Sequence, residues 1–284
     1  LAWATAAGVS IYSDTYAEQI LIKNGRAVGV SGRVIDPKNQ SVIANIKVNA
    51  QIVVAAAGAI HTPLLLQRSK VPNKNDQLGR NLCLHPTSVV LGKFPVPVYG
   101  WRGAFAGMHV DEFLTEANGK MLMESGLAAP VQLMAQNELS VGVDHIRFME
   151  EFKYFSALNV LVPDTGHGFV HWSGPIRGGA KRIEWNMTKD EFNVYKEGLK
   201  RAGRIFFAAG AERIYLPTYQ RIQATSVNEL DDIVESIDYG ALGLFSMRLV
   251  SLNAQGSCRM GADRKKAVVD PYGQVYEVSG LFVS

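Results

Sequence analysis

Residues 45–63 constrain the fold more than any other stretch, because they predict a strand, a glycine turn and a helix in immediate succession. The stretch begins with apolar residues alternating at Ile46 and Val48 and continues into the unbroken apolar run Ile52–Ala57. Such a run is typical of a strand that is buried on both faces. Gly58 follows directly and allows the sharp bend that a helix on the sheet requires. The stretch therefore predicts an α/β architecture.

The helix after this bend carries its own start signals. Thr62 is placed to cap it, and Pro63 suits its first turn. A strand, a glycine and a helix N-terminus in this order let the backbone approach the phosphates or ribose of a dinucleotide. The same glycine also occurs purely for close packing of a strand on a helix, so the unit alone leaves both interpretations open.

A β-hairpin is predicted near the start of the chain. Two apolar-rich runs, 17–23 and 26–34, flank Asn24 and Gly25. Asn-Gly favours the two-residue turn in which both residues take positive φ.

The middle of the chain contains the clearest helix signal. Thr188 and Glu191 form a capping box, and Gly210 marks the end of the helix. Apolar residues recur at helical spacing and are interpreted as core: Phe192, Tyr195, Leu199, Ala202 and Phe206. The basic residues on the other side are expected to form a solvated face: Lys196, Lys200, Arg201 and Arg204. Upstream, 166–172 and 181–187 alternate as half-buried strands do.

Composition limits the classes of function. The 284 residues are 47% hydrophobic and 19% charged, enough for one large or two modest cores. The net charge of +3 is spread along the chain, which gives no support for nucleic-acid binding. No apolar run is long enough to predict a membrane span, and no signal peptide is predicted at the first residue, Leu1.

Two other chemistries find little support in the residues. Cys83 and Cys258 are expected to be buried free thiols, since two cysteines are too few for a disulfide framework. His167 and His171 lie four apart, but no third ligand completes a metal site at a typical spacing, so no metal is expected. Ser257, next to Cys258, lacks the partners of a nucleophile, and Cys258 is interpreted as a packing residue.

Four motifs occur in a characteristic order along the chain. They are AEQILIKNGRAVGV at 17–30, VVAAAGAIHTPLLLQRS at 53–69, LGRNLCLHP at 78–86, and GSCRMG with VVDPYGQVYEVSGLFV at 256–283. In order and spacing the chain resembles the glucose–methanol–choline (GMC) flavoprotein oxidoreductases, most of all their long-chain-alcohol-oxidase branch. The resemblance implies an α/β (α+β overall) fold, in which a partial Rossmann-like FAD-binding domain carries an inserted antiparallel-sheet substrate domain. The implied boundaries are 1–86 for FAD binding, 87–250 for substrate binding and 251–284 for a return to the FAD-binding domain.

The resemblance also implies roles for particular residues. The backbone of Ala17 matches a position that meets the adenine side of FAD, and Gly58 and Ala59 match the close-approach turn. Asn253 stands where the family has a catalytic histidine facing the flavin and the alcohol. The exit from the flavin domain is matched by Gly79, Asn81, His85 and Pro86, and His85 is expected to be a structural hydrogen-bonding residue rather than a catalyst.

The implied reaction moves a hydride from an alcohol carbon to FAD while a base takes the hydroxyl proton. An amide such as that of Asn253 can hydrogen-bond the hydroxyl but cannot serve as the base. Since the chain contains no G-x-G-x-x-G, this stretch alone is not expected to hold FAD tightly or to fold independently. The start at Leu1, in what resembles the end of a helix, is interpreted as the interior of a longer protein, and the family pattern continues beyond Ser284.

Three hypotheses follow. The first is an FAD-dependent oxidoreductase acting on a long-chain or otherwise apolar alcohol. The second is an inactive remnant or gene fragment of the same family, serving at most as a non-catalytic binding protein. The third keeps the enzyme but leaves its electron acceptor open between oxygen and a quinone or cytochrome. Some members of the long-chain branch sit at membranes, but the sequence shows no anchor and gives no compartment.

Overall fold

The computed structural model describes residues 1–115, 119–126, 129, 141–218, 222–239 and 247–284. These form two compact units. Unit 1 contains residues 1–83, 165–186 and 254–284, and unit 2 contains residues 84–164 and 187–253. The boundaries near 86 and 250 predicted from the sequence lie within a few residues of these. The segment 165–186 differs, because the sequence assigned it to the inserted domain whereas it packs within unit 1.

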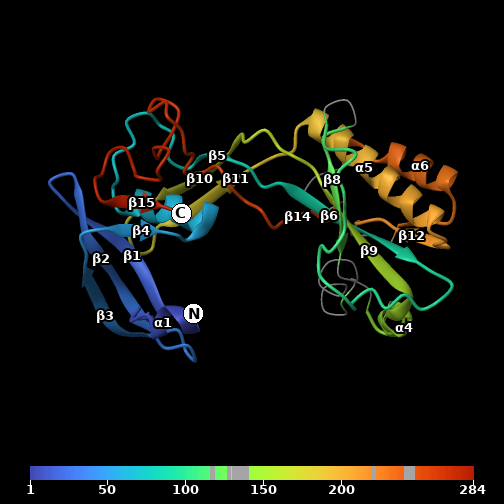
Figure 1. The fold of residues 1–284 in the computed structure, drawn as a ribbon, viewed down its shortest axis with the longest axis horizontal. Coiled ribbons are helices and arrows are strands. Elements are labelled where there is room, and N and C mark those ends of the chain that lie inside the picture. The colour runs from blue at the N-terminus through green and yellow to red at the C-terminus, as the bar shows by residue number, and fades with distance from the viewer. Residues whose placement is uncertain (116–118, 127–128, 130–140, 219–221, 240–246) are drawn as a thin grey trace. The chain divides into compact units, whose positions relative to one another are not determined.

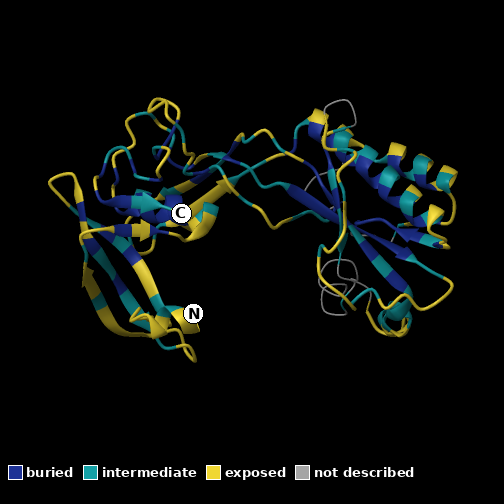
Figure 2. Ribbon diagram, viewed as in Figure 1, coloured by how far each residue is buried: buried dark blue, intermediate teal, exposed yellow. Residues whose placement is uncertain are grey.

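Unit 1 begins with the short helix α1 (Ala2–Ala6) and an antiparallel three-stranded sheet (Figure 1). Its strands are β1 (Thr15–Lys23), β2 (Arg26–Ile35) and β3 (Val42–Asn49). The predicted hairpin is confirmed, since Asn24 and Gly25 have φ of 50° and 72° between β1 and β2. The edge strand β3 is exposed along almost its whole length (Figure 2).

The single strand predicted for residues 45–58 is wrong, because two strands with different partners occupy this stretch. After β3 has paired with β2, β4 (Val53–Ala55) pairs in parallel with β15 (Leu281–Val283). The N–H of Ala50 still donates to β2, whereas the N–H of Val53 donates to the carbonyl of Gly280. Burial on both faces is also wrong for the described chain, since Val54 is 57% exposed between two buried neighbours.

Helix α2 (Gly58–Arg68) starts five residues earlier than the sequence predicted, with Ala57 rather than Thr62 at the N-cap. Thr62 is therefore not the N-cap but a buried residue inside the helix, and its hydroxyl accepts the N–H of Ala57 at 2.9 Å. Pro63 likewise lies inside the helix rather than in its first turn.

The remainder of unit 1 is a second small sheet and a turn-rich C-terminal segment. The sheet consists of β5 (Arg80–Leu82), β10 (Gly168–Ser173) and β11 (Ala180–Glu184). The pairing of β10 with β5 is what places 165–186 in this unit. The side chain of Gln67 on α2 extends this pairing, because it donates to the carbonyl of Val170 and accepts the N–H of Trp172. The core of unit 1 includes Ile20, Leu66, Leu78, Val275, Val278 and Leu281.

Unit 2 is a mainly antiparallel sheet with two helices, α5 and α6, beside it (Figure 1). Among the described residues the strands run in the order β13 (Gln223–Ala224), β12 (Arg213–Tyr215), β6 (Pro86–Lys93), β9 (Phe155–Leu161), β8 (Leu122–Gly126) and β7 (His109–Val110). The short β14 (Val250–Ser251) also pairs with β6. A further helix, α4 (Val143–Glu151), leads through a 3-10 turn at Phe152–Tyr154 into β9. The mixture of helices and antiparallel sheets confirms the α+β class.

The long helix α5 (Lys189–Ala208) is confirmed in both its start and its buried face. Thr188 and Glu191 make the two reciprocal hydrogen bonds of a capping box, at 3.2 and 2.7 Å. Every residue of the predicted apolar stripe is buried. Within that stripe, the hydroxyl of Tyr195 lies 2.5 Å from that of Ser88 on β6. The stripe is therefore core, as predicted.

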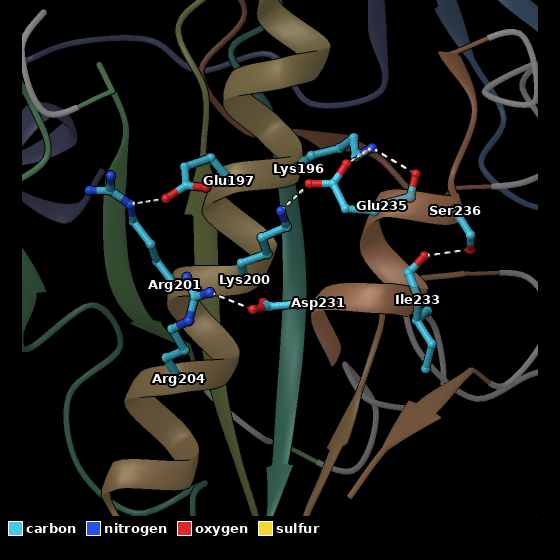
Figure 3. Close-up of polar contacts among 9 residues, drawn as sticks. All are labelled: Lys196, Glu197, Lys200, Arg201, Arg204, Asp231, Ile233, Glu235 and Ser236. Atoms are coloured by element: carbon cyan, nitrogen blue, oxygen red, sulfur yellow. Dashed lines mark hydrogen bonds and ion pairs between the residues drawn. The ribbon is translucent and has the colours of Figure 1, made fainter. Parts of the chain in front are cut away.

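The solvated basic face predicted for α5 is largely wrong. Lys196 and Lys200 both pair with Glu235 on α6 (Val227–Ser236), and their side chains are only 14% and 15% exposed (Figure 3). Arg204 pairs with Asp231 on the same helix at 2.6 Å. Because lysine and arginine stems can cover apolar surface while their charged ends pair, these residues hold α6 against α5.

Candidate functional site

The turn between β4 and α2 presents an open backbone in unit 1. Gly58 is exposed, has φ of +74°, and would have no heavy atom within 4 Å of an added Cβ. The N-cap residue, Ala57, supplies no side-chain acceptor to the first turn of α2. The first N–H groups of the helix thus have no side-chain cap, and the backbone at Gly58 is accessible from solvent.

A buried hydroxyl holds the first turn of this helix. Pro63 has no N–H, so the carbonyl of Ala59 four residues earlier loses its usual helical donor. The hydroxyl of Ser257, whose residue is 1% exposed, donates to this carbonyl. Ser257 thus fastens the C-terminal motif to the Gly58–Ala59 turn. This role of Ser257 was not predicted from the sequence, because Thr62 was interpreted as the N-cap; the signal for it is Pro63, four residues after Ala59.

The third predicted cofactor residue, Ala17, lies on the edge strand β1. Its pairing with β2 is interrupted by a bulge between Ala17 and Gln19, and Ala17 is exposed. Its carbonyl accepts from Nη2 of Arg68 at 3.3 Å, while Nη1 of Arg68 donates to the hydroxyl of Tyr16 at 2.5 Å. Arg68 therefore fixes the backbone of β1 at the predicted adenine-side position.

The exit motif is locked in place by close backbone contacts. A Cβ on Gly79, which has φ of +88°, would lie 2.2 Å from the carbonyl oxygen of Val170. The N–H of Gly79 donates to the carbonyl of Ser257 at 2.8 Å, and Cys83 exchanges two backbone bonds with Gln255. No other residue type fits at Gly79, so this motif and the C-terminal motif are joined through main-chain contacts.

His85 occupies a strained position in unit 2. Its φ is +51°, and its N–H donates to Asp164 at 3.3 Å, next to that of Leu84 at 2.7 Å. Its carbonyl accepts the hydroxyl of Thr87 at 3.1 Å. The residue is half-buried, and β6 begins immediately after it.

Asn253 lies beside His85. Its Nδ2 is 3.2 Å from Nδ1 of His85, and Asn253 itself is exposed. The pairing of β14 with β6 brings the two together, and the hydroxyl of Ser251 also donates to the carbonyl of Leu84. Both residues lie in motifs recognisable in the sequence, but their contact was not predicted, because residues so far apart in the sequence meet only through strand pairing.

The remaining reactive side chains have structural surroundings. Cys83 and Cys258 are only partly buried, so the full burial predicted for them is wrong. Cys258 does pack against the core of unit 1, as predicted, and desolvation raises the pKa of its thiol to about 12, so the thiol stays neutral. His167 places one ring nitrogen 2.9 Å from Thr165 Oγ1 and the other against the carbonyl of Asn186. Within the described residues, no three His, Cys, Asp or Glu side chains converge on a metal position.

An ion pair between the buried carboxylate of Glu18 and the exposed guanidinium of Arg177 lies beside β1 in unit 1. Arg177 binds both carboxylate oxygens of Glu18, at 2.9 and 2.7 Å, and lowers the pKa of that carboxyl against the effect of its burial.

Among the described residues, no helix is long and apolar enough to cross a bilayer.

Comparison with known proteins agrees with this arrangement of motifs. Residues 1–87 match the N-terminal domain of GMC oxidoreductases, and residues 164–284 match the C-terminal domain. The chain belongs to the GMC oxidoreductase family, a family of FAD-dependent oxidoreductases.

The relatives include bacterial and plant proteins. An uncharacterised GMC-type oxidoreductase of Mycobacterium tuberculosis is 30% identical over 99% of this chain and 42% of its own length. A long-chain-alcohol oxidase of Arabidopsis thaliana is 28% identical over 99% of this chain and 39% of its own length. An FAD-dependent oxidoreductase from Chaetomium thermophilum shares the fold, with a TM-score of 0.56 at 18% identity over 99% of this chain and 57% of that one. The chain thus spans less than half the length of these two curated relatives.

Proposed function

We propose that the protein is an FAD-dependent oxidoreductase that converts the hydroxyl of a long-chain or otherwise apolar alcohol to a carbonyl. The observation that carries the proposal is the Gly58–Ala59 turn. It combines open space, uncapped helix N–H groups and a dedicated anchor, Ser257, supplied by the C-terminal motif. The exposed backbone at Gly58 supports main-chain contact with a dinucleotide, because no described side chain covers it.

The residues present fit FAD through main-chain groups. Gly58 and Ala59 would approach the dinucleotide, and the backbone of Ala17, fixed by Arg68, would meet its adenine side. The bound flavin supplies a hydride acceptor. On the alcohol side, Asn253 would hydrogen-bond the substrate hydroxyl and orient it, because its exposed amide can donate or accept.

The substrate class follows the relatives. Four of them are long-chain-alcohol oxidases of Arabidopsis thaliana, and another, 25% identical over 99% of this chain and 50% of its own length, is a 2-methyl-1,2-propanediol dehydrogenase of Mycolicibacterium austroafricanum. We therefore assign an alcohol as substrate and favour a long aliphatic one. The electron acceptor is oxygen or a quinone, and both belong in the assay.

The test is a flavin spectrum and an alcohol panel on the protein expressed from its complete reading frame. We expect bound oxidised flavin that is bleached anaerobically by 1-dodecanol more rapidly than by ethanol. Oxygen uptake and reduction of a soluble quinone then distinguish the two acceptors. Absence of bound flavin after reconstitution with FAD would refute the proposal.

A second candidate is a non-catalytic binding protein of the same fold, and the amide at Asn253 favours it. Loss of a general base lowers a rate by about a hundred- to ten-thousand-fold. Under this alternative the protein binds flavin and alcohol, shown by a perturbed flavin spectrum on adding 1-dodecanol, but the flavin stays oxidised. Bleaching by the alcohol would exclude it.

A further inference from the structure

We propose that His85 is the proton acceptor of this reaction and that Asn253 is its positioning partner. The inference rests on the proposed function and names the base that the amide at Asn253 cannot provide. It is carried by the strained backbone of His85, by the side chains that hold it, and by its contact with Asn253.

The backbone of His85 is held where an L-residue is strained. A φ of +51° places it in the left-handed region, which residues other than glycine enter rarely. One distant and one local side chain hold this conformation: Asp164 accepts the N–H of His85, and the hydroxyl of Thr87, two residues on, donates to its carbonyl. Ser251 holds the carbonyl of the preceding residue. Strain that is so thoroughly held is characteristic of functional positions.

The ring of His85 is held at one nitrogen. Asn253 faces Nδ1 at 3.2 Å, and among the described residues Nε2 has no hydrogen-bond partner. The amide nitrogen and oxygen of asparagine exchange places on rotation of the amide, so the same contact serves both orientations. With the oxygen toward the ring, Nδ1–H donates to Asn253 and the lone pair lies on Nε2. That tautomer is the one a base requires.

The proton transfer balances with the flavin as oxidant. With FAD bound as the hydride acceptor, the O–H bond of the alcohol would break and its proton would pass to Nε2 of His85; the carbinol C–H bond would lose its hydride to the oxidant and the carbonyl bond would form. The resulting imidazolium keeps its Nδ1–H bond to the oxygen of Asn253. A neutral imidazole accepts a proton at the nitrogen that carries the lone pair and can later release it to solvent.

The neighbouring carboxylate does not compete for this role. Both oxygens of Asp164 accept backbone N–H groups, one from Leu84 and one from His85. Among the described residues, Asp164 is the charged residue that hydrogen-bonds to His85, and it does so through the backbone N–H of His85. Its removal would release the backbone of His85 rather than remove a base.

The central experiment measures flavin reduction by 1-dodecanol in the His85→Asn variant. Asparagine tolerates positive φ, so the backbone conformation is retained while the base is lost. We expect bound flavin and an unchanged melting temperature, with kcat/KM lowered by about a hundred- to ten-thousand-fold and the acidic limb of its pH profile abolished. In His85→Gly, which relieves the strain, added imidazole should restore part of the rate.

The same substitution, made in a variant that already carries Asn253→His, distinguishes a catalytic base from a structural residue. In Asn253→His, an imidazole stands at the position where the family has its catalytic histidine. There, adding His85→Asn should lower kcat/KM by less than about tenfold, because a second base is present. A structural role for His85 would give equal losses in both backgrounds.

The outcomes distinguish this inference from the proposed function. If the unaltered protein reduces its flavin with alcohol and His85→Asn does so within about threefold of that rate, His85 is not the base and the function stands. Failure of imidazole rescue together with equal losses in both backgrounds also overturns the inference. If the unaltered protein binds no flavin, or never reduces it, both proposals are wrong.

Discussion

The two regions proposed to meet the reactants present different chemical groups. In unit 1, the Gly58–Ala59 turn offers main-chain groups, fastened by Ser257 through the carbonyl of Ala59. In unit 2, His85 and Asn253 offer side-chain groups, on a backbone held by Asp164 and Thr87. Cofactor binding at the first region would therefore depend on backbone conformation, and substitutions there should be tolerated wherever the added Cβ fits. The second depends on side-chain chemistry, so a single substitution can remove a function and leave the fold intact.

The largest effect on stability is expected from Gly79→Ala in unit 1. The added Cβ would meet a carbonyl oxygen 2.2 Å away at a φ of +88°. Overpacking and backbone strain together should lower the free energy of unfolding by roughly 3–5 kcal/mol. Urea unfolding measures this, and a loss below about 1 kcal/mol would show that this main-chain junction is not rigid.

Ser257→Ala should come next. It leaves the carbonyl of Ala59 without a donor, at a cost of about 1–3 kcal/mol, and should weaken FAD binding. The control is the same change in a Pro63→Ala background, where the restored helical N–H can bond that carbonyl. Calorimetric unfolding and FAD titration should both show a smaller loss there. Equal losses in the two backgrounds would contradict the role assigned to Ser257.

Gly58→Ala is the matched comparison for Gly79→Ala. Its φ of +74° is similar, but nothing lies within 4 Å of the new Cβ. We expect only about 1–2 kcal/mol of destabilisation from backbone strain, together with a marked loss of FAD affinity, because the Cβ fills the space proposed for the ligand. Unchanged FAD affinity by fluorescence titration would remove Gly58 from the proposed cofactor site.

The smallest effect concerns the ion pairs between α5 and α6 in unit 2. Hydrogen bonds from Lys200, then Lys196, lower the pKa of Glu235 from 4.5 to about 2. A lowered folded-state pKa stabilises the protein above the unfolded-state pKa, and this contribution is lost as the pH falls from 4.5 toward 2. The melting temperature of Glu235→Gln should therefore be slightly below that of the unaltered protein near neutrality and should converge with it in acid. A difference independent of pH would indicate that the carboxylate charge contributes nothing.

Part of the candidate site was accessible from the sequence. Gly58, Ala59 and Asn253 were predicted because they lie in motifs that can be recognised from a single sequence by their order and spacing. The anchor Ser257 and the pairing of His85 with Asn253 were not, because each joins residues more than 160 positions apart. No local pattern encodes such contacts.

By itself, the sequence determined the elements whose interactions are local. Asn24 and Gly25 form the hairpin turn because both tolerate positive φ, and Thr188 starts α5 through bonds within its first turn. Tertiary structure decided the rest. The break between β3 and β4 follows from a change of partner strand, and 165–186 joined unit 1 by pairing with β5. Strand pairing and buried hydrogen bonds depend on which distant segments meet, and that is settled only when the whole chain packs.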